Sequence, residues 1–197
     1  MGVFITIEGP NGVGKSTFIA ALKKELEKAY TVYVTSEPSP SGLGNFVREN
    51  EIGLQGRSYA LLIAADRCFH LEKFVVPNLS QYDVVVSDRY IESSLVLQHA
   101  DGLSLDEIWD INKRFLVPDI SVVLDANSAL LQTRLSERLN LTYFEKELSR
   151  GTERELYAVA ADYLKNRGFN VHCIDNNTED DMNNGVNRVK LALDELF

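Results

Sequence analysis

Short apolar runs alternate along the chain with longer segments in which apolar residues recur at helical spacing. The runs are rich in Val, Ile and aromatic residues. A run such as Val84–Val86 has no polar face, which is typical of parallel strands covered on both sides. This alternation predicts an α/β domain with a doubly wound, five-stranded parallel sheet flanked by helices. The predicted strands are Val3–Ile7, Thr31–Thr35, Asp83–Ser87, Ile120–Leu124 and Asn170–Ile174.

The segments between these runs carry the start and stop signals of helices. The clearest helical pattern spans Arg57–Lys73. The residues Ser104–Glu107 form a capping box, and the helix they open is expected to end before Pro118. The Pro- and Gly-rich segment Glu37–Gly44 is expected to be a loop. The other predicted helices are Thr17–Ala29, a helix capped by Asn127 or Ser128 that runs toward Arg138, Glu153–Arg167 with Gly168 as its C-cap, and Met182–Leu196.

Length and charge narrow the class of protein. The 197 residues predict a single domain over 1–197, and the net charge of −9 without a Lys/Arg-rich block argues against a nucleic-acid partner. A small anionic ligand stays possible, because a few local arginines suffice to bind it. Cys68 and Cys173 lack metal-ligand or disulfide spacing and are expected to be small buried side chains in a reducing compartment. The chain shows neither a signal-peptide pattern nor an apolar run of membrane-spanning length, which predicts a cytoplasmic protein with no membrane partner.

The run Gly9-Pro10-Asn11-Gly12-Val13-Gly14-Lys15-Ser16 fits the phosphate-binding pattern G-x-x-x-x-G-K-[ST]. It stands between a predicted strand and a predicted helix, which is the context that this loop requires. Its glycines let successive backbone N–H groups point at phosphate oxygens, and the helix adds the positive end of its dipole. Lys15 is predicted to reach the β- and γ-phosphates of a nucleotide, and the Ser16 hydroxyl is predicted to ligate Mg²⁺.

Polar residues follow the carboxyl ends of all five predicted strands, where open parallel sheets bind their ligands. Asp88 is suited to a metal ion or its water, and the planar guanidinium of Arg89 is suited to a phosphate. The alternative is that these two residues belong to a local ion-pair network. The residues expected at this edge are Glu8, Glu37-Pro38, Ser87-Asp88-Arg89-Tyr90, Asp125 and Asp175-Asn176-Asn177.

The helix Arg57–Lys73 places Tyr59, Ile63, Arg67 and His70 along one face. An arginine on the same stripe as an aliphatic side chain can donate hydrogen bonds to the edge of a base while the aliphatic residue covers the ring. The helix by itself favours a plainer interpretation, in which Arg67 is a surface residue paired with a neighbouring carboxylate and His70 is exposed.

Three separated strings in the correct order resemble the thymidylate kinase family of P-loop nucleoside monophosphate kinases. They are FITIEGPNGVGKST, LLIAADR and VVVSDRYIESSLVLQ, and the resemblance extends from about Val3 to Asp125 and again over Val171–Asp175. It implies a P-loop kinase fold with a short helical lid at about 136–152. It also implies transfer of the γ-phosphoryl group of ATP to dTMP, which gives dTDP, with Mg²⁺ as cofactor, small nucleotides as partners, and a homodimer.

The resemblance also implies a role for each matching position. Arg89 and Arg48 would grip the acceptor phosphate, Arg67 would hydrogen-bond the thymine, and Gln98 would contact the base. The implied catalytic residues are Lys15, Asp88, Arg89 and Arg138; those for ATP are Gly9, Asn11, Gly12, Val13, Gly14, Lys15, Ser16, Thr17 and Arg134; those for the acceptor are Asn11, Glu37, Arg48, Ile63, Arg67, Arg89, Ser94 and Gln98; and those for the metal are Ser16 and Asp88.

The sequence departs from the family pattern on the acceptor side and in the lid. Asn11 replaces a carboxylate near the sugar, Ile63 replaces a Phe that stacks on thymine, and Leu97 replaces a Tyr. Thr142-Tyr143 replace Asp-Arg in the lid. Val13 stands where some members carry an arginine, and members whose loop lacks this arginine use a basic lid residue instead. Of the candidates Arg134, Arg138, Arg150 and Arg154, the pair Arg134 and Arg138 shares a helix face and is preferred, although both could be ordinary solvated charges.

These departures leave three alternatives beside a kinase that acts on dTMP. The first is a family member retuned to another nucleotide. The second is a nucleoside kinase in which Glu37, just after the second strand, is the catalytic carboxylate. The third is a nucleotide-binding protein without catalysis, against which Lys15, Ser16, Asp88 and Arg89 argue.

Overall fold

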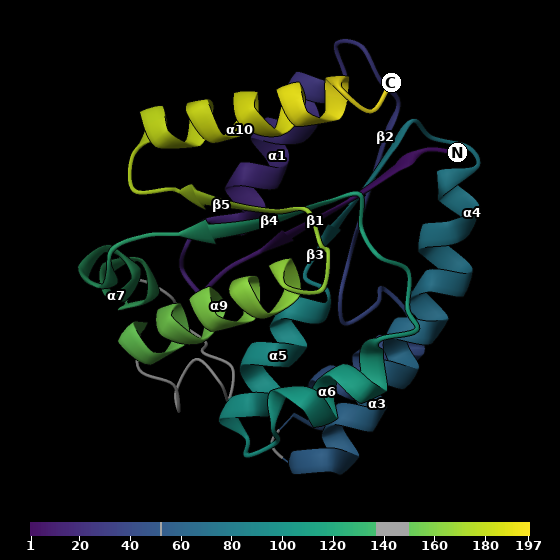
Figure 1. Ribbon diagram of the computed structural model, residues 1–197, viewed down its shortest axis with the longest axis vertical. Coiled ribbons are helices and arrows are strands. Elements are labelled where there is room, and N and C mark those ends of the chain that lie inside the picture. Colours follow the sequence, from purple (N-terminus) through teal and green to yellow (C-terminus); the bar gives the residue numbers. More distant parts are fainter. Residues whose placement is uncertain (52, 137–149) are drawn as a thin grey trace.

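The computed structural model describes residues 1–51, 53–136 and 150–197, although the side chains of residues 150 and 151 are not described. Its centre is a five-stranded sheet in the order β2-β3-β1-β4-β5, in which all neighbouring pairs are parallel. The predicted doubly wound α/β fold is therefore confirmed (Figure 1). The strands are β1 (Val3–Glu8), β2 (Val32–Ser36), β3 (Val84–Asp88), β4 (Ile120–Asp125) and β5 (Val171–Asp175).

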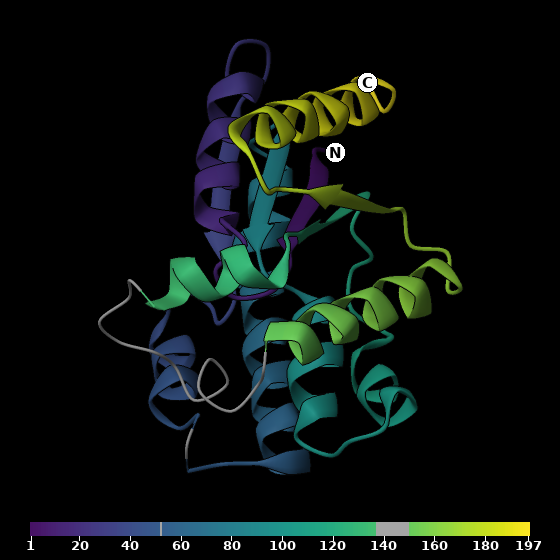
Figure 2. The same cartoon turned by 90° about the vertical axis from the view of Figure 1, so that its left-hand side faces the viewer.

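Helices cover both faces of the sheet. On one face α1 and α10 lie side by side, and their apolar residues share one core cluster with the strands (Figure 2, purple and yellow). On the other face α3, α5, α6 and α9 surround a second cluster that contains the buried side chains of Phe4 and Tyr90. The helical segments are α1 (Lys15–Leu26), α2 (Gly42–Glu49), α3 (Gly56–His70), the π-helical turn η1 (Leu71–Val75), α4 (Val76–Leu79), α5 (Ile91–Ala100), α6 (Leu105–Asn112), α7 (Ser128–Ser136), α9 (Arg150–Lys165) and α10 (Glu179–Asp194).

The predicted helix signals hold at several ends. Ser104 and Glu107 form the capping box of α6, and Asn127 rather than Ser128 caps α7, because its Oδ1 accepts the Leu130 N–H at 2.9 Å. Gly168 has a φ of +86° after the end of α9, as its assignment to the C-cap requires. The helix predicted over Arg57–Lys73 ends at His70, and the chain continues through η1 into α4.

Three short helices, α2, α4 and α5, were not predicted, and α2 and α5 matter for the site. The expected loop at 37–44 already contains the start of α2, which Ser41 caps by accepting the Gly44 N–H at 3.2 Å. The helix α5 follows the Asp88-Arg89 pair directly and is buried on nearly all sides, so its sequence shows no polar stripe. The helices α2 and α5 contribute residues to the site described below.

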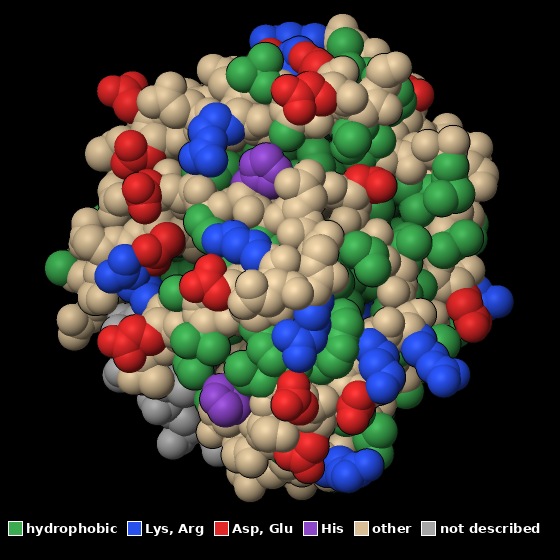
Figure 3. Space-filling view, viewed as in Figure 1, with side chains coloured by type: hydrophobic (Ala, Val, Ile, Leu, Met, Phe, Trp, Pro, Cys, Tyr) green, Lys and Arg blue, Asp and Glu red, His purple; other side chains and the backbone are tan. Residues whose placement is uncertain are grey.

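The prediction for the cysteines was wrong, because Cys68 and Cys173 are both exposed. Cys68 is not among the buried residues of α3, and Cys173 lies on β5, the strand at one edge of the sheet. Lys and Arg side chains are interspersed with Asp and Glu side chains on the face shown in Figure 3. Over its described residues, the chain forms no helix that is long and apolar enough to cross a membrane.

Candidate active site

The glycine-rich loop joins the buried strand β1 to α1 and bends sharply between them. Gly9, Gly12 and Gly14 have φ angles of +136°, +83° and +96°, which side chains with a Cβ rarely adopt. A Cβ at Gly9 would also lie 2.4 Å from the backbone oxygen of Leu124, so the loop packs too closely on β4 for any other residue. Val13 faces the core behind the loop, and its backbone oxygen accepts the Asn176 amide at 2.7 Å. The loop is thus held in one conformation, with α1 beginning at Lys15.

Lys15 is buried at the start of α1. Its Nζ donates to the backbone oxygens of Gly9 at 2.8 Å and Pro10 at 3.3 Å. Burial, with the nearby Arg89 guanidinium as the next cause, lowers the pKa of Lys15 to about 7. An anion placed beside this amine would favour its charged form.

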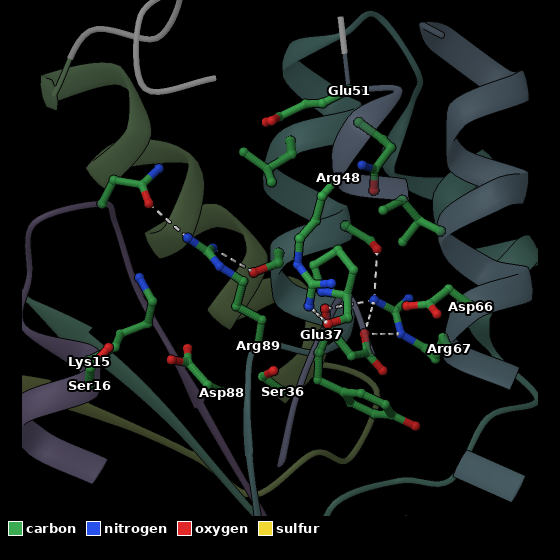
Figure 4. Close-up of a pocket in the computed structure, with 18 of the residues that line it drawn as sticks. Lys15, Ser16, Ser36, Glu37, Arg48, Glu51, Asp66, Arg67, Asp88 and Arg89 are labelled. Atoms are coloured by element: carbon green, nitrogen blue, oxygen red, sulfur yellow. Dashed lines mark hydrogen bonds and ion pairs between the residues drawn. The ribbon is translucent and has the colours of Figure 1, made fainter. Parts of the chain in front are cut away.

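Asp88 ends β3 opposite the loop and lies beside Lys15 and Ser16 (Figure 4). Its Oδ1 is buried and has no hydrogen-bond partner among the described residues. A buried carboxylate oxygen without a partner is costly, and a cation is the natural ligand for it. The Asp88 carboxylate and the Ser16 hydroxyl therefore fit the donor set that Mg²⁺ uses when it also binds nucleotide phosphates.

Arg89 follows with a φ of +76°, which is uncommon for a residue other than glycine. Its guanidinium donates to Asn11 Oδ1 at 2.7 Å, Ser93 Oγ at 3.1 Å and the Tyr157 hydroxyl at 3.2 Å. These partners are neutral, so the local ion-pair network offered as the alternative is not what holds this side chain within the described residues. Strained backbone at a charged residue is frequent in functional sites.

Arg67 lies at the far end of the same cavity and is 1% exposed. Its Nε donates to Glu37 Oε2 at 2.9 Å, its Nη2 to the Tyr90 backbone oxygen at 2.9 Å and to Ser94 Oγ at 3.0 Å, and its Nη1 to Asn112 Oδ1. His70 is fully buried and contacts Glu37 and Thr35. The plainer interpretation of a surface Arg67 and an exposed His70 was therefore wrong, because α3 turns this face toward β2 and α5.

Both oxygens of the Glu37 carboxylate are engaged. Oε2 accepts from Arg67, and Oε1 lies 3.2 Å from His70 Nδ1. Arg48 reaches the next residues of this segment, where its Nη2 donates to the backbone oxygens of Pro38 and Ser39, beyond the cis peptide bond Glu37–Pro38. The segment after β2 thus holds the guanidinium of Arg67 through Glu37, and its backbone oxygens accept hydrogen bonds from Arg48.

A single cavity of about 440 Å³ joins the two ends. In Figure 4 Lys15, Ser16 and Asp88 lie on one side, Glu37 and Arg67 lie on the other, and Arg89 stands between them. The cavity brings together every residue predicted for the acceptor, and also most of those predicted for ATP. The predicted residues that line it are Asn11, Gly12, Gly14, Lys15, Ser16, Thr17, Glu37, Arg48, Ile63, Arg67, Asp88, Arg89, Ser94 and Gln98.

Three predicted residues in the described part of the chain are not part of this lining. Gly9 packs against the backbone of Leu124, and the Val13 side chain is buried in the core. Arg134, on α7, donates to the backbone oxygens of Val13 at 3.1 Å and Gly12 at 3.4 Å, so it reaches the loop but not the cavity. Arg138 lies outside the described residues, as does most of the predicted lid. The alternative candidate Arg154 pairs with Asp125 at 2.5 Å.

Glu8 corrects the expectation that every polar residue after a strand faces the ligand. It is fully buried, and its carboxylate accepts the Ser93 hydroxyl at 2.7 Å and the backbone N–H groups of Ser93 and Tyr90. It therefore braces the start of α5, where backbone N–H groups lack helical partners. Asp125 likewise pairs with α9 rather than with the cavity.

The sequence reasoning missed several residues that complete the site. Glu51 lines the cavity from the turn after α2, and Asn112 holds Arg67 from the end of α6. Glu153 and Tyr157 reach Asn11 and Arg89 from α9. No local pattern points to them, since each is an isolated polar residue whose partner lies far away in the chain.

A parallel sheet of order 2-3-1-4-5, a phosphate-binding loop between β1 and α1, and a second basic pocket in the same cavity define a P-loop phosphotransferase. Residues 7–183 match the family model described as thymidylate kinase. The chain belongs to the thymidylate kinase family.

Individual relatives agree with this assignment. A probable thymidylate kinase from Caldivirga maquilingensis is 39% identical over 151 residues, which cover 74% of each chain. A thymidylate kinase from Clavibacter sepedonicus is 45% identical over 144 residues, 68% of each chain. The crystal structure of the thymidylate kinase from Ehrlichia chaffeensis superposes with a TM-score of 0.72 at 27% identity and covers 98% of both chains.

Proposed function

We propose that this protein transfers the γ-phosphoryl group of ATP to dTMP, which gives dTDP. The observation that carries the proposal is the single cavity, with the phosphate-binding loop and Lys15 at one end, the buried Arg67 at the other, and Arg89 between them. A cavity of this kind suits phosphoryl transfer, which needs positioning and charge stabilisation rather than a covalent nucleophile.

On the donor side, the loop backbone and Lys15 would hold the β- and γ-phosphates. Ser16 and Asp88 would hold Mg²⁺, which neutralises phosphate charge when it is bound. Arg134 is proposed to contact ATP, because it already donates to the carbonyl groups of the loop. The lid at 136–152 and the contribution of Arg138 to catalysis are also part of the proposal and rest on the family resemblance.

On the acceptor side, Arg89 and Arg48 would bind the phosphate, and Arg67, Ser94 and Gln98 would bind the base. Gln98 is 2% exposed, and its Oε1 has no hydrogen-bond partner among the described residues. This oxygen can accept the N3–H of thymine. One hydrogen on Nη1 of Arg67 has no acceptor among its contacts in the described part of the chain, and it can be donated to a base carbonyl.

Glu37 argues against the alternative of a nucleoside acceptor. A general base must reach the hydroxyl that it deprotonates, and its carboxylate must be available to take the proton. Here the carboxylate is held by Arg67 and His70. A phosphate group on the acceptor is already ionised, so no general base is needed to deprotonate it. The Arg89 guanidinium would bind that phosphate.

A homodimer and a cytoplasmic location complete the proposal. Both rest on the family resemblance, and the half-exposed Leu61 on α3 and Val76 on α4 support a contact between copies. Light scattering of the purified protein measures the oligomeric state.

The central experiment measures ADP release from ATP-Mg²⁺ with a panel of nucleoside monophosphates and with thymidine. We expect rapid turnover with dTMP, slow turnover with other monophosphates and none with thymidine. Lys15→Ala should abolish turnover without a change in the circular dichroism spectrum. Preference for thymidine, or for a monophosphate of a different base, would contradict the proposal.

A further inference from the structure

Glu153 is a buried carboxylate outside the cavity lining. It belongs to the first turn of α9, and its side chain is completely inaccessible to solvent. Its Oε1 accepts both the backbone N–H of Asn11 and the Asn11 side-chain amide, each at 3.0 Å. These contacts bridge 142 residues of sequence. Because a buried carboxylate is costly unless it accepts hydrogen bonds, this contact is a specific one.

Asn11 passes the contact on to Arg89. The amide group donates with its nitrogen to Glu153 and accepts with its oxygen from Arg89 Nη2, at 2.7 Å. An amide can donate at one end and accept at the other, whereas an ionised carboxylate can only accept. Glu153 therefore decides which way the amide of Asn11 points, and this orientation presents an oxygen to the guanidinium.

A second contact runs from the same helix to the same arginine. Tyr157, one helical turn after Glu153, accepts from Arg89 Nη1 at 3.2 Å. Arg89 is thereby held from two directions by neutral oxygen atoms. Among the described residues, no carboxylate is hydrogen-bonded to the Arg89 guanidinium. The guanidinium can therefore form an ion pair with a phosphate.

We propose that Glu153 is a positioning residue, which orients Asn11 and, through it, the phosphate-binding guanidinium of Arg89. This inference rests on the proposed function. It gives a physical reason for an amide at position 11, where the family resemblance implies a carboxylate. Here α9 supplies the negative charge, and a second carboxylate at position 11 would repel it.

A charge swap tests the proposal. Asn11→Asp places two carboxylates face to face, and the double variant Asn11→Asp/Glu153→Gln restores one donor and one acceptor. We expect Asn11→Asp to lower kcat/KM for dTMP by about tenfold or more, with the KM for ATP nearly unchanged, and the double variant to recover to within about threefold of the wild type. Glu153→Ala should lower kcat/KM for dTMP in the same way. Glu155→Ala, an exposed glutamate of the same helix, is the matched control and should behave as the wild type does.

The outcome that would overturn the proposal is a double variant no better than Asn11→Asp, or a Glu153→Ala enzyme with wild-type kinetics. A readout without substrate separates this failure from failure of the proposed function. The side-chain Nε–H signal of Arg89, assigned by its loss in Arg89→Lys, should shift in Asn11→Asp and return in the double variant. If the signal does not move, Arg89 is not positioned through Asn11, whatever the enzyme phosphorylates. If it moves and returns while the wild type does not phosphorylate dTMP, only the proposed function fails.

Discussion

At the scale of single residues, the site consists of charged side chains whose environment sets their chemistry. Lys15 is a buried amine beside an arginine, and both its burial and the positive charge of Arg89 disfavour its protonated form. Arg67 is a buried guanidinium that keeps its charge because Glu37 is in direct contact with it. The same residue types on the surface would have ordinary properties, so burial gives the site much of its character.

The lowered pKa of Lys15 predicts proton uptake when nucleotide binds. At pH 8 an amine with a pKa of about 7 is roughly nine-tenths neutral, and the phosphates of ATP raise its pKa by favouring the charged form. Calorimetric titration with ATP-Mg²⁺ at pH 8, in buffers of different ionisation enthalpy, should therefore report uptake of up to about one proton. The uptake should disappear in Lys15→Met. A binding enthalpy that does not depend on the buffer would contradict the prediction.

An aromatic side chain in place of Ile63 should strengthen the binding of the acceptor base. Ile63 lines the cavity on the same helix as Arg67 but offers no ring to stack on a base. Ile63→Phe should bind dTMP more tightly by about 1 kcal/mol or more, which is at least about a fivefold lower dissociation constant. Ile63→Leu, similar in volume but not aromatic, is the control and should change little. Weaker binding in Ile63→Phe would mean that the pocket is shaped for a different acceptor.

At the scale of elements, local signals and packing contribute differently. Capping residues marked the starts of α6 and α7 correctly, because a cap is a contact between near neighbours in sequence. The start of α2 was missed because its glycines favour a loop, yet a Cβ at Gly44 would lie 1.9 Å from the Ser39 backbone oxygen. That glycine is present for close packing. The helix α5 was missed because burial on nearly all sides leaves no polar stripe.

The capping box of α6 allows a local test of stability. The Ser104 hydroxyl accepts a hydrogen bond from the backbone N–H of Glu107 and donates one to the Glu107 carboxylate at 2.7 Å. Ser104→Ala should lower the free energy of unfolding by about 1 kcal/mol, which lowers the melting temperature by about 2–4 °C for a chain of this size. Turnover at 25 °C should stay unchanged, because the cap lies outside the cavity. A larger loss, or a loss of turnover, would show that α6 does more than hold Asn112 in place.

At the scale of the whole molecule, stability should depend on a buried carboxyl group. Glu92 of α5 is fully buried against β4, where its carboxyl oxygen accepts a hydrogen bond from the Ser121 hydroxyl. Burial, with the neighbouring Glu8 as the next cause, raises the pKa of Glu92 to about 8. The folded state thus holds a proton that the unfolded chain releases above its ordinary value of 4.5. This contribution to stability is complete below that value and is lost progressively as the pH rises toward 8.

Glu92→Gln removes this titration. Between pH 5 and 7.5 the wild type should lose up to about 1.4 kcal/mol of unfolding free energy per pH unit relative to the variant. Urea unfolding of both proteins at several pH values measures the difference. A difference that is constant over this range would mean that Glu92 ionises with its ordinary pKa in the folded protein.

The sequence alone determined the alternation of strands and helices, the phosphate-binding loop and the family, because these depend on periodicity and on contiguous residues. It also named many of the side chains that meet in the cavity. Those after the strands could be named because the carboxyl ends of parallel strands gather at one edge of a sheet, and those on the helices because the sequence resembles the family. Only the tertiary structure decided how these side chains are held. Burial of Arg67 by α6, engagement of Glu37 by two partners, and the contact of Glu153 with Asn11 join residues that are far apart in the chain. Hydrogen bonds and charges act over a few ångströms in space, so separation along the sequence carries no record of them.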